Sequence, residues 1–407
     1  MSELRSHARR SADPSNSVSL RQWNRARVLT HIIRERETTR AAIARTTRLS
    51  PASAANIVGE LVEEGLVEER GSRPSSGGRP TGIVGARPDG ALAVGIDVGE
   101  WGVAAELFDL SMTRVDREFG GGEQPATASA IATEIRAVVA ALRMRHEDQW
   151  DRVVGIGLGL PGVVETSSEG TQTLYAQSMG WPPVAVSDLC PVNDLPVLAE
   201  NGAKLQASAE LWFGNARGAE HTLVALLGRG VGLGVIANGR ITGGSDSSAA
   251  EWGHTVIGLG GPQCRCGNRG CLEAYIGADA ILDAWRRRDA HFEGRGWNAL
   301  NALIEARAAR DTAATEVIDQ VLAALGAGLG SLVNLMNPTR ILVGGWVGQR
   351  LIEEYPREIQ DEMTRHCLAR FAAQVELAPT RFGGDAVAIG AGVLSLDALV
   401  IRAKAPR

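Results

Sequence analysis

The chain has 407 residues, well above the ~150 typical of one domain, so we expect two or three domains. Its composition, 44% hydrophobic and 22% charged, is that of a globular protein with a sizeable core and excludes a disordered chain. The N-terminus lacks the apolar stretch of a secretory signal, and apolar stretches such as the one from Val321 fall short of the ~18 residues that cross a bilayer. Five cysteines are too few for a disulfide framework. We therefore expect a cytoplasmic protein with no membrane partner.

The net charge of −5 conceals a difference between two parts of the chain. Residues 1–90 contain 15 arginines and 10 acidic residues, which gives a net charge of +5. The remaining residues therefore carry −10. A basic N-terminal part attached to an acidic body is typical of a protein in which only the first part approaches a polyanion such as DNA.

The basic part shows the pattern of three helices followed by a two-stranded hairpin. Apolar residues recur with helical spacing, and Ser50 and Pro51 suit the N-cap and the first position of the third helix. This order of elements predicts a winged helix-turn-helix domain. The predicted elements are helices at about 20–36, 39–46 and 51–66, strands at 66–70 and 83–84, and an arginine-bearing loop at 71–80.

The third predicted helix buries one apolar stripe and leaves short polar side chains on the face that a major groove would meet. The loop between the strands carries arginines suited to phosphate or minor-groove contact. A small helical domain for dimerisation or protein binding is the alternative, but the helix order, the charge and the polar face together favour DNA. The residues predicted to contact DNA are Arg48, Ser50, Ser53, Asn56, Arg73 and Arg79.

The acidic body shows one arrangement twice: an apolar strand, a glycine turn and a second strand. Between these hairpins the apolar residues recur with helical spacing. The repetition predicts two α/β lobes that face each other across a cleft. The predicted strands are 91–99, 103–110, 152–160, 223–228, 231–237 and 340–344, and amphipathic helices cover about 131–142 and 318–332.

Four potential metal ligands lie close together in the acidic body: His254, Cys264, Cys266 and Cys271. Three thiols and one imidazole at these spacings match the tetrahedral donor set that Zn²⁺ prefers, and the neighbouring glycines permit sharp turns. Because four protein ligands leave no open position, we predict a structural zinc ion. Free cysteines or a disulfide are the alternatives; cysteines two residues apart bridge poorly in a loop, and a cytoplasmic setting disfavours a disulfide.

The whole chain resembles the ROK family, which joins repressors, open reading frames and sugar kinases. The most specific match is Gly253-His254 followed by QCRCGNRGCLE at 263–273. The resemblance implies an actin-like (ribonuclease H-like) α/β fold of two lobes behind an N-terminal winged helix-turn-helix. The implied domains are 1–88 for the winged helix, about 89–205 with 386–407 for lobe 1, and about 206–385 for lobe 2.

The resemblance also implies a sugar site next to the zinc ligands. The positions of Asn201, Glu251, His254 and Glu273 contact sugar hydroxyls in the family, and the histidine binds zinc through its other ring nitrogen. Carboxylates suit this role because they are strong hydrogen-bond acceptors for vicinal hydroxyls. Solvated loop acids are the alternative reading of both glutamates. Ser247 and Ala250 replace glycines that are usual in the family.

The residues for phosphoryl transfer depart from the family pattern in three places. The family's Asn-Asp pair, which supplies the general base, reads Asn201-Gly202 here, and glycine cannot accept a proton. The first phosphate loop, usually Asp-x-Gly-Gly-Thr, contains Glu100 and Trp101, a repelling charge and a bulky indole. The second, usually Gly-Thr-Gly, contains Arg229. We therefore predict that the protein is not an enzyme.

Together these features predict a sugar-responsive transcriptional regulator, with repression of carbohydrate genes as its expected role. Operator DNA and a small-molecule sugar are the expected partners, and a homodimer or homotetramer would match a palindromic operator. Two alternatives stay open. One is a bifunctional sugar kinase of the ROK family, and the other is a regulator that senses a partner protein instead of a sugar.

Overall fold

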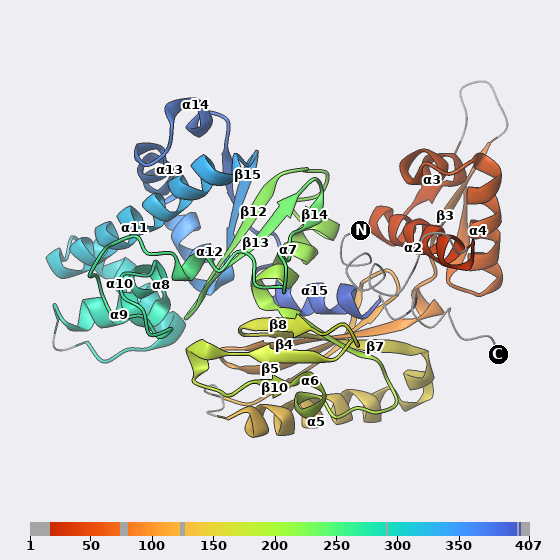
Figure 1. Ribbon diagram of the computed structural model, residues 1–407, viewed down its shortest axis with the longest axis horizontal. Helices are drawn as coiled ribbons and strands as arrows, with labels where there is room; N and C mark the ends of the chain where they lie inside the picture. Colours follow the sequence, from red (N-terminus) through yellow and green to blue (C-terminus); the bar gives the residue numbers. More distant parts are fainter. Residues whose placement is uncertain (1–16, 74–79, 123–126, 290–291, 397–398, 400–407) are drawn as a thin grey trace. The chain divides into compact units, whose positions relative to one another are not determined.

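The computed structural model describes residues 17–73, 80–122, 127–289, 292–396 and 399 (Figure 1). The chain divides into two compact units. Unit 1 consists of residues 1–174, 183–200 and 387–407, and unit 2 consists of residues 175–182 and 201–386. The longer segment of unit 2 begins at residue 201, and the family resemblance implies a boundary at about 206.

Residues 17–73 and 80–86 fold into three helices and a small sheet, as the sequence predicts. The helices are α2 (Ser17–Glu35), α3 (Arg40–Thr47) and α4 (Pro51–Glu63), and the strands are β1 (Thr38–Thr39), β2 (Val67–Arg73) and β3 (Thr81–Ala86). The sheet has the order β1-β3-β2. Strand β1 is too short to produce a sequence pattern; its pairing with β3 adds a third strand to the predicted hairpin.

Side-chain hydrogen bonds cap the N-termini of two of these helices, and apolar packing holds the three helices together. The Thr39 hydroxyl accepts a hydrogen bond from the first turn of α3 at 3.2 Å, and the Ser50 hydroxyl accepts one from the first turn of α4 at 3.1 Å. The apolar stripes meet in a core in which Ile32, Ile43 and Leu61 are fully buried. The helical periodicity of the sequence therefore identifies the side chains that hold this domain together.

Unit 1 also contains a five-stranded mixed sheet. Its strands are β4 (Leu92–Gly99), β5 (Gly102–Asp109), β6 (Arg114–Gly120), β7 (Val153–Leu160) and β11 (Val197–Asn201), in the order β11-β7-β4-β5-β6. The first two strands form the predicted hairpin, and β7 adds to β4 in parallel. A second, three-stranded sheet and a short helix comprise β8 (Val163–Thr166), β9 (Gln172–Tyr175), β10 (Val184–Ala185) and α6 (Val186–Leu189).

Helices cover both faces of the larger sheet of unit 1 (Figure 1). Helix α5 (Ala128–Arg145) packs on β5 and β6. Helix α15 (Ala386–Ser395) lies against the other face, directly on two glycines. A Cβ atom at Gly95 would lie 2.0 Å from the Ala388 carbonyl oxygen, and one at Gly157 would lie 1.9 Å from the Ala391 carbonyl oxygen. Only glycine therefore permits this close approach of helix and sheet.

Unit 2 repeats the strand order of the sheet in unit 1. Strands β12 (Thr222–Leu227) and β13 (Val231–Ala237) form the hairpin, and β15 (Arg340–Gly344) adds to β12 in parallel. With β14 (Arg240–Ile241) and β16 (Glu376–Pro379) the order is β14-β13-β12-β15-β16. The internal repetition seen in the sequence is therefore a repetition of topology.

The helices of unit 2 are α7 (Gly202–Phe213), η4 (Trp252–His254), α8 (Glu273–Ile276), α9 (Ala278–Arg286), α10 (Gly296–Ala308), α11 (Thr312–Met336), α12 (Gly345–Glu354), α13 (Pro356–Arg365) and α14 (Ala369–Ala372).

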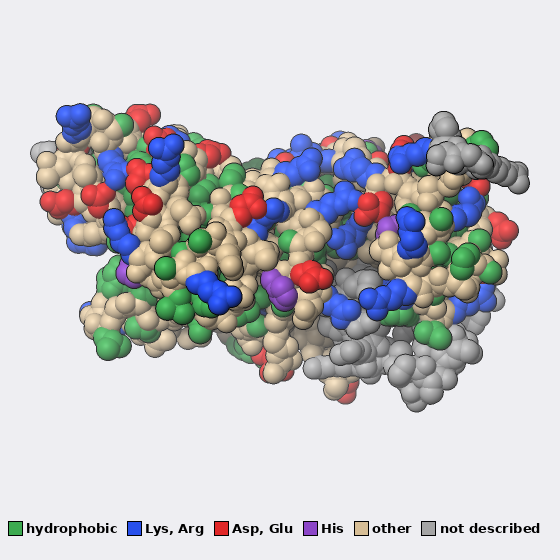
Figure 2. Space-filling view, turned by 90° about the horizontal axis from the view of Figure 1, so that it is seen from above, with side chains coloured by type: hydrophobic (Ala, Val, Ile, Leu, Met, Phe, Trp, Pro, Cys, Tyr) green, Lys and Arg blue, Asp and Glu red, His purple; other side chains and the backbone are tan. Residues whose placement is uncertain are grey.

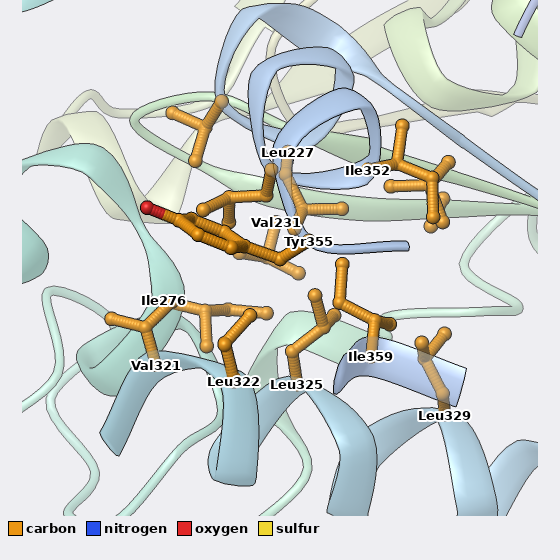
Figure 3. Close-up of a cluster of buried hydrophobic side chains, with 14 of the residues drawn as sticks. Leu227, Val231, Ile276, Val321, Leu322, Leu325, Leu329, Ile352, Tyr355 and Ile359 are labelled. Atoms are coloured by element: carbon orange, nitrogen blue, oxygen red, sulfur yellow. The ribbon is translucent and has the colours of Figure 1, made fainter. Parts of the chain in front are cut away.

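The core of unit 2 forms around α11. Leu322, Leu325 and Leu329 of this helix meet Leu227 and Ile359 in the cluster shown in Figure 3. Among the described residues, α11 is long and apolar enough to cross a bilayer, which corrects the expectation that every apolar stretch is too short. Of its apolar window, 67% is buried inside the protein, as in the core helix of a globular domain.

Charged side chains of both signs are interspersed on the face shown in Figure 2. The protein also has ion pairs at its surface: Arg288 lies 3.2 Å from Glu316, and Arg307 lies 2.6 Å from Asp319. Exposed pairs of this kind contribute about 0–1 kcal/mol each to the free energy of unfolding. The buried apolar clusters, and not these pairs, therefore provide most of the stability.

Candidate functional site

The four predicted metal ligands lie together in unit 2. One donor atom from each of His254, Cys264, Cys266 and Cys271 lies within 4.8 Å of the others. Nδ1 of His254 is 3.7 Å from Sγ of Cys264, and Sγ of Cys266 is 3.7 Å from Sγ of Cys271. Zinc–sulfur bonds of about 2.3 Å in a tetrahedron place neighbouring donor atoms about 3.8 Å apart. The four residues can therefore hold a metal ion, and their donor set fits Zn²⁺.

Sharp turns, and not a helix, position the cysteines. The Cys264 N–H donates to the Asn268 carbonyl oxygen at 2.8 Å, and the Gly267 N–H donates to the Cys264 carbonyl oxygen at 3.1 Å. Gly270 has a φ of 77°, and a Cβ atom there would lie 1.8 Å from the Gly258 carbonyl oxygen. Glycine is therefore required at position 270 for both backbone conformation and space.

The surroundings of Cys264 and Cys271 disfavour an isolated thiolate. Cys264 and Cys271 are buried. Desolvation and the neighbouring thiols raise the pKa of Cys271 to about 12. Such a thiol stays protonated at neutral pH unless a cation compensates the charge of its thiolate. A bound metal ion supplies this compensation, so the burial of these side chains is consistent with a metal centre.

The two acidic residues predicted to contact a sugar flank this cluster in different environments. Glu251 immediately precedes η4, and its side chain is exposed. Glu273 begins α8 and is 6% exposed. Its Oε2 accepts a hydrogen bond from the Val231 N–H at 3.0 Å, and its Oε1 lies 3.2 Å from the guanidinium of Arg265. Glu273 is therefore a buried, partnered carboxylate, which excludes the solvated alternative for this residue.

Arg265 connects the metal loop to the turn between β12 and β13. Besides its ion pair with Glu273, it donates to the Arg229 carbonyl oxygen at 3.0 Å. The side chain of Arg229 in turn donates to Asp279 at 3.0 Å. The sequence analysis did not predict a role for Arg265. The only feature of the sequence that indicates one is its position between Cys264 and Cys266. The turn between β12 and β13 corresponds to the second phosphate loop. Two arginines, Arg229 and Arg265, therefore line this turn.

The first turn of α7 places one predicted residue and one that the sequence analysis missed. Asn201 is the N-cap, and its Oδ1 accepts a hydrogen bond from the Ala203 N–H at 2.9 Å, so its amide oxygen already has a structural role. Gly202 is the first residue of the helix. Lys204 is 2% exposed and donates to Ser247. The only signal for Lys204 in the sequence is its rarity, because the chain has two lysines.

The turn that corresponds to the first phosphate loop lies in unit 1. Glu100 and Trp101 occupy the turn between β4 and β5, and Gly99 pairs with Gly102 across it. The Trp101 side chain is 46% exposed. A tight turn closed by this strand pair presents a carboxylate and an indole at its tip, and neither group donates a hydroxyl to a phosphate.

The residues predicted to contact DNA are mostly exposed. Ser53 and Asn56 lie on the exposed face of α4, and Arg48 is exposed at the C-cap of α3. Ser50 is exposed as well, but its hydroxyl contacts the N–H and the hydroxyl of Ser53 and so caps the helix. Arg73 ends β2, 3.7 Å from Glu37. Arg79 lies outside the described residues.

A winged helix domain, followed by two sheets of the same strand order, defines the class of this protein: a regulator-type chain built on the actin-like kinase fold. The ROK family model matches residues 93–398, and the MarR family model matches residues 21–76. The chain belongs to the ROK family. The predicted fold class, winged helix included, is confirmed.

The chain is similar to both regulators and kinases. It is 24% identical to the xylose repressor of Bacillus subtilis over 95% of this chain and 98% of the relative. It is 32% identical to a glucokinase of Halalkalibacterium halodurans over 74% of this chain and 94% of the relative. In structure it is similar to a ROK family transcriptional regulator described as a homologue of Escherichia coli Mlc, with a TM-score of 0.75, 24% identity and coverage of 94% and 98%. A Streptomyces griseus glucokinase in complex with glucose and AMPPNP gives a TM-score of 0.62, 25% identity and coverage of 75% and 99%.

Proposed function

We propose that this chain is a transcriptional repressor of carbohydrate genes that binds operator DNA and responds to a sugar. The observation that carries the proposal is the presence of a winged helix in a ROK chain, with an exposed polar face on α4. The xylose repressor matches 95% of the chain, whereas the glucokinase matches 74%. The additional length is what a DNA-binding domain requires. We further propose a homodimer or homotetramer in the cytoplasm, since a two-fold oligomer matches a palindromic operator.

The proposed sugar site consists of Asn201, Glu251, His254 and Glu273. With Nδ1 of His254 on the metal side, Nε2 is left to contact a sugar hydroxyl. Glu273 Oε1 lies 3.9 Å from the thiol of Cys264, so a sugar contact there would adjoin the metal ligands. A structural Zn²⁺ held by His254, Cys264, Cys266 and Cys271 would fix the loop and so preorganise the contacts.

We propose that phosphoryl transfer has been lost. Gly202 provides no general base at the start of α7, and the two turns carry Glu100, Trp101 and Arg229 where the family has small or hydroxyl residues. General-base catalysis contributes typically about 10²–10⁴-fold to a rate, and losing phosphate positioning compounds this loss. The glucokinase relative keeps a sugar kinase as the second candidate function.

One set of measurements on the full chain tests these proposals. Calorimetric titration with glucose, xylose and N-acetylglucosamine measures sugar binding, anisotropy with operator DNA measures the response, and coupled ADP release measures turnover. We expect sugar binding that changes DNA affinity by about 5–150-fold without ADP release. Robust ADP release would establish the kinase instead. Zinc-loaded, DNA-binding protein that binds none of these sugars would favour a partner-protein signal.

A further inference from the structure

The first turn of α7 contains a buried lysine with no part in the proposed chemistry. Lys204 is 2% exposed and lies near the N-terminal end of the helix, where the helix dipole disfavours a positive charge. A buried ammonium group requires hydrogen-bond acceptors. Ser247, far along the chain, supplies two of them: Nζ donates to the backbone oxygen of Ser247 and, at 3.1 Å, to its hydroxyl.

Ser247 belongs to a loop, residues 243–251, whose backbone is unusual at two residues that carry a Cβ. Ser247 has a φ of 59° and Ala250 a φ of 74°. Residues other than glycine rarely adopt this left-handed conformation, and they keep it only where their surroundings impose it. The 243–251 loop ends at Glu251, so its conformation decides where this carboxylate lies.

We propose that Lys204 is a positioning residue of the sugar site, which holds Ser247 in its left-handed conformation and thereby fixes the 243–251 loop and Glu251. The inference rests on the proposed sugar-binding function, because Glu251 is the contact that this loop provides. Lys204 acts through Ser247 and not on the ligand.

The charges in this region agree with that role. Desolvation of its carboxylate raises the pKa of Glu251, and the neighbouring His254 and Lys204 oppose the rise, whereas Glu273 adds to it. Lys204 therefore also favours the ionised form of Glu251, which is the stronger acceptor for hydroxyl groups.

Hydrogen–deuterium exchange on the full chain tests the coupling of Lys204 to the loop without any sugar. The amides of Ala249 and Trp252 report on the loop, because they donate to Gly243 at 3.0 Å and to Ala250 at 2.7 Å. We expect Lys204→Met to speed their exchange by about tenfold or more. The matched control is Gln206→Met, two residues away in α7 and 1% exposed, which should leave the exchange of these amides unchanged.

A double-mutant cycle separates positioning from packing. Glycine adopts a positive φ at no steric cost, so Ser247→Gly in the Lys204→Met background should restore most of the protection. The sugar affinity is measured by titration with glucose, xylose and N-acetylglucosamine. We expect Lys204→Met to lower the affinity for the sugar that the wild type binds by about tenfold, because only a fraction of the molecules keep the loop in the conformation that binds sugar. The double variant should regain most of this affinity.

Unchanged loop exchange in folded Lys204→Met, or equal effects of Lys204→Met and Gln206→Met, would overturn the inference. If Lys204→Met does not fold, Lys204→Gln decides the question, because its shorter, neutral side chain cannot bring an ammonium group to the two oxygens of Ser247. Faster exchange in the 243–251 loop of that variant supports the inference, and wild-type exchange overturns it. A wild type that binds none of the sugars contradicts the proposed function alone, since the exchange measurements need no ligand.

Discussion

The guanidinium of Arg265 lies 3.2 Å from the buried carboxylate of Glu273, so a residue between two metal ligands holds a residue of the proposed sugar site. The same carboxylate accepts the Val231 N–H at the start of β13. The metal loop, the proposed sugar site and the β12–β13 turn thus share one hydrogen-bonded network within unit 2.

Removing Arg265 should disturb the sugar site while leaving the metal in place. In Arg265→Ala, Glu273 loses its cationic partner, and we expect sugar affinity to fall about tenfold and the free energy of unfolding to fall by about 1 kcal/mol. Calorimetry and urea unfolding measure the two effects. Arg269→Ala, in the same loop, is the control and should have neither effect. Equal sugar affinities in the two variants would contradict the role of Arg265.

Purified protein should contain about one zinc ion per chain. Cys266→Ser removes one of four ligands, so it should release the metal and lower the melting temperature of the whole body, because binding free energy of a structural ion is folding free energy. Metal analysis by mass spectrometry and thermal unfolding check both expectations. Cys367→Ser, outside the cluster, should keep its zinc. Reduced wild-type protein without zinc would refute the assignment.

The winged helix should read DNA with separable contributions from two residues. Asn56→Ala, on the exposed face of α4, should cost about 1–3 kcal/mol at particular base pairs and relax discrimination there. Arg48→Ala should weaken binding evenly across sequences and reduce the slope of log affinity against log salt by about one. Anisotropy titrations at several salt concentrations distinguish the two patterns. Operator binding that survives deletion of residues 1–88 would show that another part of the chain reads DNA.

Restoring a carboxylate at position 202 should not restore catalysis. Gly202→Asp returns the family's general base to the start of α7, but Glu100, Trp101 and Arg229 still occupy the phosphate turns. We expect no ADP release above background in a coupled assay with ATP and each sugar. Turnover by this single variant would show that the two phosphate turns still accept a nucleotide.

Asp116 should make part of the stability of unit 1 depend on pH in the acid range. Its hydrogen bond with Arg145, at 2.8 Å, lowers the pKa of this carboxyl from 3.8 to about 2, with a further contribution from His146. Because the folded pKa is depressed, the stabilisation is complete above the unfolded pKa of 3.8 and is lost as the pH falls toward 2. Urea midpoints measured between pH 5 and pH 2.5 should therefore fall less steeply in Asp116→Asn than in the wild type. Parallel curves would contradict this contribution.

The sequence by itself determined the features that depend on local pattern. Helical periodicity predicted α2 and α4, and Ser50 and Pro51 predicted where α4 begins, because caps and amphipathic stripes are properties of a few neighbouring residues. The repeated strand–turn–strand pattern predicted two lobes built on a common unit, and each unit contains the predicted hairpin. The four metal ligands fall within 18 residues, so their spacing alone was enough to predict that they lie close together.

Only the tertiary structure decided the surroundings of the candidate sugar site. The bond between Lys204 and Ser247 joins residues 43 apart, and the bond between Val231 and Glu273 joins residues 42 apart. No local pattern predicts such pairs, because they arise where separate elements pack against each other. The same packing made Glu273, a predicted sugar contact, a buried carboxylate with two partners, and it made the amide of Asn201 a helix cap. Burial and partners, which set the charge and position of these groups, are properties of the folded chain and not of the spacing of its residues.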